Sequence, residues 1–441
     1  MDNPFSESIE KIRQQFDRAP YPKIPLDKTP KDEINFLYIH NLVTPYYLRN
    51  QKVIETEGKV ILDAGCGSGY KALALAEANP GAKIVGVDLS KQSTDLSSKR
   101  LQYHGYENAE FHPISIEDLP SLDLEFDYIN CDEVLYLIPD PIAGLQAMKS
   151  VLKPDGILRV NLHSSLQRAT YYRAQSAFKL MGLMDESPGD IQIELVQEIM
   201  VALKDTILLK SATWKNVGKN EERILANYLL QGDKGYTIPE VFAALSEVDL
   251  EFICMVNWRE WQLLDLFKNP ENLPAFLSMS LPGTSIEEQL HLFELLHPVH
   301  RLLDFWCGHP SEAKSFLPVS EWDSSDWQGT KVHLHPQLRT AVFKQRLVAC
   351  LSELTPFNLS QILQTKQGTT VLVDRAMAEC LFPLLEEGAQ PFESLVNRWQ
   401  QLHPVHPVTL EPTTDTEAAQ NLQKVLAQLE ELGIVLLEPL A

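Results

Sequence analysis

The sequence is poor in basic residues and lacks long apolar runs and cysteine motifs. Its 441 residues include 38 Lys and Arg against 60 Asp and Glu, for a net charge of −22. Such a surface repels phosphate backbones, so we expect no nucleic-acid partner. No apolar run approaches the roughly 20 residues of a membrane helix, so we expect no membrane partner. The six cysteines are scattered without a CxxC pair, which predicts free thiols in a cytoplasmic protein.

The N-terminal residues predict a helix and a cap. The opening MDNPFSESIEKIRQQF lacks the basic region and apolar core of a signal peptide and is predicted to form an amphipathic helix. Residues 1–58 as a whole contain many aromatics and prolines. We interpret them as a cap folded over the rest of the protein, in which the aromatics Tyr21, Tyr38, Tyr46 and Tyr47 form a lid over a ligand. Ordinary packing of an N-terminal helix is the alternative.

From residue 59 the sequence alternates between apolar strands and helices. Strands are predicted at 60–62, 83–88, 109–113, 126–131 and 156–162, with helices over 70–79 and 91–104. This alternation is typical of an α/β fold, a parallel sheet with crossover helices. We assign residues 59–165 to this domain. The chain length predicts two or three domains in all.

Beyond the sheet, three further parts are expected. Strand signals stop after Leu162, and residues 166–308 are predicted to form a helical accessory or substrate domain. Residues 309–336 contain few helix signals and are predicted to be a linker. Residues 337–441 end in an amphipathic helix, a glycine and a short apolar strand. This order predicts a winged-helix-like domain, used either for peptide docking or for homodimerisation.

The motif VILDAGCGSGY, residues 60–70, carries the chemistry. It places Asp63 and three alternating glycines, Gly65, Gly67 and Gly69, between a strand and a helix. Glycine permits the sharp turn and close approach of a ligand, while the helix N-terminus offers N–H groups to an anionic ligand end. The G-x-G-x-G spacing differs from that of dinucleotide folds, and the acid would repel a pyrophosphate but attract an ammonium group. S-adenosylmethionine, with an amino-acid end, a ribose and no phosphate, meets these conditions.

Further candidate ligand contacts follow the next three strands. Asp88, 25 positions after the first acid, ends the strand in VGVDLS and is placed to accept hydrogen bonds from both ribose hydroxyls. Leu89 is expected to cover one face of the adenine. Ile116 and Glu117 follow the third strand. Ile116 would pack on the adenine, and Glu117 would accept a hydrogen bond from its exocyclic amine. Cys131 ends the fourth strand, at the carboxyl edge where α/β sheets bind ligands.

With FDYINCDEVLYLI and LKPDGIL following in order, residues 59–162 resemble class I S-adenosylmethionine-dependent methyltransferases. The resemblance implies a Rossmann-like sheet and S-adenosylmethionine as the cofactor. Some other Rossmann-like domain is the alternative. The predicted cofactor-binding residues are Asp63, Gly65, Cys66, Gly67, Gly69, Asp88, Leu89, Ile116, Glu117 and Cys131.

The flanking regions narrow the resemblance. YPKIP before the core and NLHSSLQRATYYRAQ after it resemble methyltransferases with a regulatory-type helical domain and a C-terminal accessory domain, among them bacterial protein methyltransferases. The stretch APYPKIPLDKTPKDEINFLYIHNLVTPYYLR also resembles cyanobacterial methyltransferases that modify an asparagine side-chain amide of the phycobiliprotein β subunit. A protein substrate is therefore implied. The alternatives are a lysine or other protein N-methyltransferase, a small-molecule N- or O-methyltransferase, and a cofactor-binding protein without turnover.

The predicted catalytic residues are Asp132, Glu133 and His163, which follow the fourth and fifth strands. An amide nitrogen is a weak nucleophile, so its site should accept an N–H and polarise the carbonyl. Asp132 or Glu133 would accept, while His163, Tyr171 or Tyr172 would donate. The alternatives are that the acids cap the next helix and that the histidine serves a loop.

The histidine pairs do not predict a metal site. They occur in two HPVH segments and one HLH segment. Proline interrupts each HPVH, and no carboxylate or cysteine pattern completes a ligand set. We therefore predict no bound metal.

Overall fold

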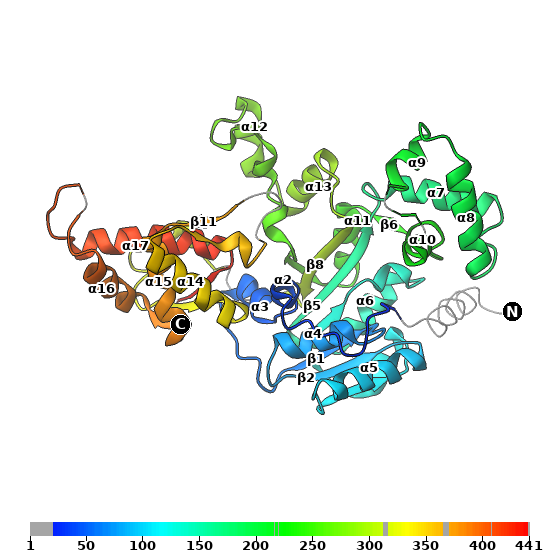
Figure 1. Cartoon of the computed structure of the whole chain (residues 1–441), viewed down its shortest axis with the longest axis horizontal. Coiled ribbons are helices and arrows are strands. Elements are labelled where there is room, and N and C mark those ends of the chain that lie inside the picture. The colour runs from blue at the N-terminus through cyan, green and yellow to red at the C-terminus, as the bar shows by residue number, and fades with distance from the viewer. Residues whose placement is uncertain are drawn as a thin grey trace.

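The computed structural model describes residues 21–215, 217–218, 220–311, 316–364, 370–406 and 408–439. The helix predicted at the very N-terminus lies outside these ranges. Figure 1 shows a sheet at the centre, helices rising from it on one side, and a separate C-terminal group of helices. No described helix has both the length and the apolar character needed to cross a membrane.

The central sheet confirms the predicted α/β fold. Its order is β3-β2-β1-β4-β5-β8-β7, with β6 paired to β5. Strands β1 to β5 run parallel, and β8 runs antiparallel to both β5 and β7. The bounds are β1 (Val60–Ala64), β2 (Lys83–Val87), β3 (Ala109–His112), β4 (Phe126–Cys131), β5 (Leu152–Ser164), β6 (Gly235–Tyr236), β7 (Glu251–Met255) and β8 (Leu302–Gly308).

Side chains of the central strands alternate between two cores, one on each face of the sheet. Leu62 and Ile129 point into one core, while their neighbours Ile61 and Tyr128 point into the other. Because both faces are covered, these strands have nearly continuous apolar sequences. The crossover helices are α4 (Tyr70–Ala78), α5 (Lys91–Tyr103) and α6 (Pro141–Ser150), together with the 3-10 helix η1 (Ile116–Leu122).

The expectation that strand signals stop after Leu162 is wrong. Strands β7 and β8 belong to the same sheet although they lie in the region predicted to be helical. Residues Leu302 to Gly308 pair with His163 to Ile157. The sheet therefore extends beyond the boundary predicted at residue 165, because its edge is completed by a segment from much later in the chain.

The remaining helices between residues 166 and 308 form two groups. Helices α7, α8 and α10 pack around a small core of their own, while α11 and α13 contribute to the core of the sheet. In Figure 1 both groups rise from the same side of the sheet. The bounds are α7 (Ala169–Leu180), α8 (Asp190–Ala202), α9 (Leu208–Thr213), α10 (Glu221–Tyr228), α11 (Ile238–Glu247), α12 (Ala275–Ser280) and α13 (Ile286–Leu296).

The C-terminal region has its own core and a three-stranded antiparallel sheet of order β12-β9-β13. The predicted final helix and strand are confirmed as α17 and β13, but β9 lies inside the predicted linker, so that part of the linker is wrong. The winged-helix resemblance is not confirmed. The bounds are β9 (Lys331–Leu334), α14 (Ala341–Glu353), β10 (Phe357–Asn358), β11 (Leu372–Val373), α15 (Arg375–Glu386), β12 (Gln390–Pro391), α16 (Phe392–Leu402), α17 (Asp415–Glu431) and β13 (Val435–Glu438).

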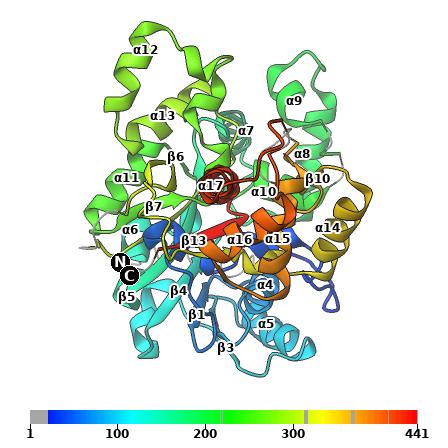
Figure 2. The same ribbon diagram turned by 90° about the vertical axis from the view of Figure 1, so that its left-hand side faces the viewer.

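The cap joins the sheet to the C-terminal region. Its helices α2 (Ile34–Ile39) and α3 (Val43–Asn50) lie between the two bodies in Figure 1. Figure 2 looks at the molecule from the side of the C-terminal body, with α15, α16 and α17 in front. The buried Tyr38 hydroxyl donates to the Gly433 carbonyl at 2.8 Å and accepts from Arg259 at 2.8 Å. One cap side chain thus connects a loop after β7 with the turn between α17 and β13. Tyr46 and Tyr47 are buried in similar contacts, so the lid predicted for these three tyrosines is wrong and ordinary packing is what the structure shows for them.

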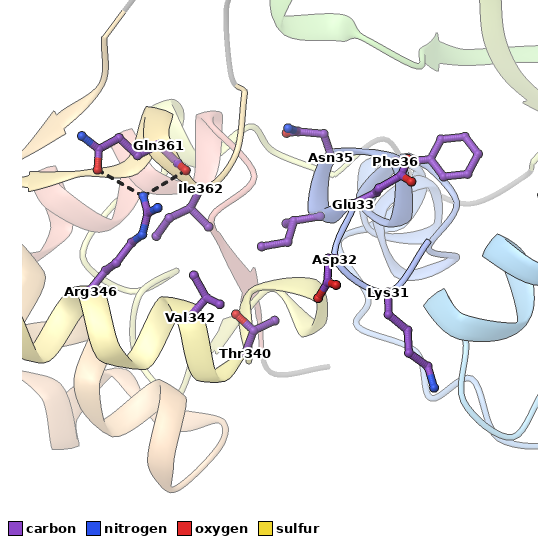
Figure 3. A pocket seen from close by; sticks show the side chains of 11 residues that line it. Lys31, Asp32, Glu33, Asn35, Phe36, Thr340, Val342, Arg346, Gln361 and Ile362 are labelled. Carbon is purple, nitrogen blue, oxygen red and sulfur yellow. Dashed lines mark hydrogen bonds between the residues drawn. The ribbon is translucent and has the colours of Figure 1, made fainter. Parts of the chain in front are cut away.

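A cavity of about 560 Å³ lies where the cap meets the C-terminal region (Figure 3). One wall is the start of α2. The other includes α14, from which Arg346 donates to Gln361. The lining residues are Lys31, Asp32, Glu33, Ile34, Asn35, Phe36, Thr340, Val342, Arg346, Gln361 and Ile362. None belongs to the predicted cofactor or catalytic set.

Replacing Tyr38 by phenylalanine is expected to lower the free energy of unfolding by about 1–3 kcal/mol, because Arg259 loses a buried acceptor and Gly433 a donor. Chemical denaturation of the full chain measures the change. Tyr103→Phe is the matched control, since Tyr103 is 60% exposed. Equal stabilities for both variants would show that the two hydrogen bonds of Tyr38 do not stabilise the contact between the cap and the C-terminal region.

Candidate active site

The glycine loop between β1 and α4 has the backbone that its sequence predicts. Gly65, Gly67 and Gly69 have φ values of 84°, 53° and 80°, in the region that favours glycine. A Cβ on Gly65 would run into Val134, and one on Gly69 into Ser97. The three glycines are therefore required both by the turn and by the close packing around it.

The N–H groups of the loop are already bonded within the protein. They donate to the backbone or to one carboxylate, as follows: Gly65 and Cys66 to the Val87 carbonyl, Gly67 to Asp88, Ser68 to the Tyr21 carbonyl, and Gly69 to the Cys66 carbonyl. These N–H groups were expected to bind the anionic end of a ligand, but each of them already donates to an acceptor within the protein. A ligand would meet the Cα faces and carbonyls of the loop instead.

Asp63 has the environment expected of a binding site for a cation. Its side chain is 1% exposed, and Oδ1 accepts from the Asn130 amide at 2.9 Å. Within the described part of the chain, Oδ2 is buried without a hydrogen-bond partner. Burial raises the pKa of Asp63 to about 6. A buried carboxylate oxygen without a partner is costly, so an ammonium group of a ligand would fit here.

Asp88 lies at the carboxyl end of β2, beside the loop. Its carboxylate accepts from the N–H groups of Gly67, at 2.9 Å, and Ser90, at 2.8 Å. Its own N–H donates to the His112 carbonyl, which places the end of β3 next to it. The structure thus fixes this carboxylate at the end of β2, and its contact with the ribose remains a prediction.

The other predicted cofactor residues differ in exposure. Ile116 and Cys131 are buried, at 7% and 0% exposure, while Leu89 is half-buried and Glu117 is exposed. Ile116 and Glu117 begin η1, and Cys131 ends β4. They therefore lie on segments that end or follow β2, β3 and β4, as predicted. Their contacts with adenine remain a prediction.

Asp132 is held by neighbouring groups on three sides. Lys71 Nζ lies 2.8 Å from its Oδ2, Asn161 donates to its Oδ1 at 2.5 Å, and Arg159 lies at 3.7 Å. Burial acts to raise the pKa of Asp132, but the charges of Lys71 and Arg159 hold it well below its usual range. Asp132 is a buried anion that fixes Lys71 and Asn161.

Glu133 is the more accessible of the two acids, with a side chain 24% exposed. Its φ of 64° is unusual for a residue other than glycine. The Asn161 amide oxygen stabilises this conformation by accepting from the Glu133 N–H at 2.8 Å. The carboxylate forms ion pairs with Arg301 and, at 3.5 Å, with Lys71. Burial opposes ionisation, but these two cations lower the pKa of Glu133.

His163 belongs to a buried Asp–His pair. Its Nδ1 lies 2.7 Å from Asp233 Oδ1, and its ring stacks on Tyr136 with centroids 3.8 Å apart. Burial lowers the pKa of His163, so the ring is neutral and donates through Nδ1. Nε2 then accepts from Arg301 at 3.1 Å. The predicted donor to a substrate is thus, in this structure, an acceptor that positions Arg301.

Comparison with known proteins agrees with this geometry. Residues 55–220 match the family model described as a methyltransferase domain. An uncharacterized protein of Synechococcus, syc1184_c, is 28% identical over 70% of this chain and 73% of its own length. A ubiquinone biosynthesis O-methyltransferase of Actinobacillus pleuropneumoniae is 35% identical over 24% of this chain. This chain spans about half of that enzyme, with 47% covered.

A solved structure has the same fold over most of its length. PKMT2 from Rickettsia typhi, in complex with AdoHcy, superimposes with a TM-score of 0.59 at 16% identity, over 95% of this chain and 77% of that one. Residues 55–220 form an S-adenosylmethionine-dependent methyltransferase domain. The predicted enzyme class and cofactor are confirmed.

The buried partnerless oxygen of Asp63 fits the ammonium group of S-adenosylmethionine, and the fixed carboxylate of Asp88 fits its ribose. When bound, this cofactor supplies an electrophilic methyl group on a sulfonium. The methyltransferase itself contributes binding, orientation and exclusion of water. The polar groups of β4, β5 and β8 lie at the carboxyl edge beside these two acids.

Sequence reasoning missed three residues of this edge. Lys71 lies in the first turn of α4, which was predicted to be an ordinary helix start. Asp233 reaches His163 because β6 pairs with the end of β5. Arg301 precedes β8, whose antiparallel direction brings it to the carboxyl edge. The apolar and aromatic run LLDFWCG before a Gly-His-Pro break was the one local signal of that strand.

Proposed function

We propose that the methyltransferase modifies a side chain of a protein substrate. The matched domain, residues 55–220, is well under half of the chain, and the remainder includes two helical groups and a C-terminal body. The likeness to PKMT2, a protein methyltransferase, extends over these additional regions and covers 95% of the chain. A small-molecule enzyme needs no such surface, whereas a folded protein substrate must be oriented from outside the site.

More specifically, we propose N-methylation of an asparagine of a phycobiliprotein β subunit. The carrying observation is the pair Glu133 and Arg301, an acceptor and a donor side by side at the carboxyl edge, with side chains 24% and 45% exposed. A primary amide presents an N–H and a carbonyl oxygen at a similar spacing. It would bind across this pair, with Glu133 accepting its N–H and Arg301 donating to its oxygen.

The other predicted residues would support this pair. His163, fixed by Asp233, accepts from Arg301 and so orients its guanidinium. Asp132 fixes Lys71, whose ammonium also lies 3.5 Å from Glu133. We therefore assign contact with the substrate to Glu133 and Arg301, and a positioning role to Asp132 and His163. We also propose that the enzyme acts in the cytoplasm, in keeping with its six cysteines, which form no disulfide among the described residues.

Lysine or other protein N-methylation and small-molecule N- or O-methylation are the alternatives. The ubiquinone biosynthesis O-methyltransferases favour the last of these, but their match is confined to about a quarter of the chain. Glu133, the more accessible of the two acids, could also accept a hydrogen bond from a lysine ammonium group. Acceptor identification, rather than sequence likeness, separates these possibilities.

The test uses the full chain, S-adenosylmethionine with a labelled methyl group, and purified phycobiliprotein. We expect label in the β subunit and, by tandem mass spectrometry, on one asparagine side chain. A β subunit with that asparagine changed to aspartate is the matched control and should remain unlabelled. Label on lysine would contradict the asparagine proposal. Label only in small molecules, after incubation with a cyanobacterial lysate, would contradict the protein substrate altogether.

Replacing Glu133 by glutamine is expected to lower kcat about tenfold with little change in cofactor affinity, because one charged acceptor for the amide N–H is lost. Asp140→Asn is a suitable control, since Asp140 caps α6 outside this site. Steady-state kinetics and titration with S-adenosylhomocysteine measure the two quantities. An unchanged kcat would contradict the contact.

A further inference from the structure

Residues 21–26, which we call the strap, lie directly against the glycine loop. The Tyr21 carbonyl accepts from the Ser68 N–H at 2.9 Å, and the Pro22 carbonyl accepts from the Ser68 hydroxyl at 2.8 Å. The approach is so close that a Cβ on Gly67 would run into the Tyr21 carbonyl. The strap therefore forms one wall of the loop that receives the methionyl end of the cofactor.

The side chain of Arg100 forms hydrogen bonds with both the strap and the glycine loop. Arg100, on α5, is fully buried at 0% exposure. Its Nε donates to the Ser68 carbonyl at 2.8 Å, and its terminal nitrogens donate to the carbonyls of Pro25 at 2.7 Å and Ile24 at 2.8 Å. Among the described residues, no Asp or Glu forms an ion pair with it; the Tyr70 ring lies 5.9 Å away.

A buried guanidinium without a carboxylate partner is unusual, because desolvation of its charge is repaid only by carbonyl dipoles. Here those carbonyls come from two segments far apart in the sequence, the strap and the loop. The fork geometry of arginine suits this task, since it donates in several fixed directions at once. The charge also remains available to favour an anionic group near Ser68.

We propose that Arg100 is a positioning residue for the amino-acid end of S-adenosylmethionine. It fixes the strap against the loop at Ser68. Its buried positive charge, next to the loop, would also attract the α-carboxylate of the cofactor and so strengthen its binding. The adenosine end, held on the side of Asp88, does not depend on it. This inference requires only that the cofactor binds at the glycine loop, and it is independent of the identity of the methyl acceptor.

The test compares two ligands that share the adenosine and differ in the amino-acid end. S-adenosylhomocysteine carries that end, whereas 5′-methylthioadenosine lacks it. In the full-length Arg100→Met variant, we expect the Kd for S-adenosylhomocysteine to rise about tenfold or more, as for the loss of one charged hydrogen-bonding group. The Kd for 5′-methylthioadenosine should stay within about threefold. Isothermal titration calorimetry measures both.

Two further variants keep the test decisive if Arg100→Met folds poorly. Arg100→Lys keeps the charge but loses the forked hydrogen-bonding geometry, and Ser68→Ala removes one hydrogen bond to the strap. Each should weaken the binding of S-adenosylhomocysteine selectively, and by less than Arg100→Met does. His104→Ala is the matched control, because the His104 ring lies 2.9 Å from the Leu26 carbonyl, at the far end of the strap from Ser68. Equal weakening of both ligands, or unchanged affinity in all Arg100 and Ser68 variants, would overturn the proposal.

Discussion

Asp63→Asn is expected to weaken S-adenosylhomocysteine binding about 100- to 1,000-fold, the range for removing one partner of a buried charge pair. The same change is expected to stabilise the unliganded protein at neutral pH. Burial raises the pKa of Asp63 from 3.8 to about 6, so its ionisation costs the folded state about 3 kcal/mol. Asparagine can still accept from Asn130 but carries no charge.

The sign of this effect gives a pH dependence. Because the folded pKa lies above the ordinary value, stability falls as the pH rises from about 4 through 6, and Asp63→Asn removes that fall. Ligand affinity has the opposite trend: the wild-type protein should bind S-adenosylhomocysteine less tightly as the pH drops below about 6, while the variant should be nearly insensitive. Calorimetric titrations and urea denaturation between pH 5 and 8 measure both trends. A variant that is less stable, or wild-type affinity that is flat across this range, would contradict the role of Asp63.

The cofactor half of the site could be predicted because its signals are local. The glycines and Asp63 lie within a single strand–turn–helix unit, and the backbone geometry of that unit is dictated by its own residues. Asp88 could be predicted because parallel strands end at a common edge. Even here the sequence did not reveal that the loop N–H groups are bonded internally, since the strap that binds Ser68 lies more than 40 residues earlier.

The half of the site proposed to bind the methyl acceptor, around Glu133 and Arg301, could not be predicted to the same extent. Its residues come together only through pairing between distant segments. Arg301 reaches Glu133 only because β8 turns antiparallel beside β5. Asp233 reaches His163 only through the two-residue strand β6. For the same reason β9 was assigned to a linker: the alternation of Val332 and Leu334 was visible, but its partner strand lies a hundred residues later. Contacts of this kind carry almost no local signal.

Arg159 is expected to be the residue on which this half of the site depends most for stability. It is 2% exposed, and two of its nitrogens contact the two carboxylate oxygens of Asp304 at 2.7 and 3.1 Å. Asn130, which binds Asp63, accepts from it at 3.3 Å, and Asp132 lies at 3.7 Å. Arg159 thus compensates the buried charges of Asp304 and Asp132. It also orients the Asn130 amide, which in turn binds Asp63.

Replacing Arg159 by methionine is therefore expected to lower the free energy of unfolding by about 3–5 kcal/mol, because Asp304 and Asp132 lose their compensating charge inside the protein. Urea denaturation measures the loss. Lys153→Met is the control: Lys153 also pairs with an acid, at 2.7 Å, but is 36% exposed and should change stability by at most about 1 kcal/mol. Adding Asp304→Asn to Arg159→Met should recover part of the loss, since the unpaired charge is then gone. If the double variant were instead as unstable as the sum of the two single variants, the ion pair would not be the source of the effect, and packing around β5 would be.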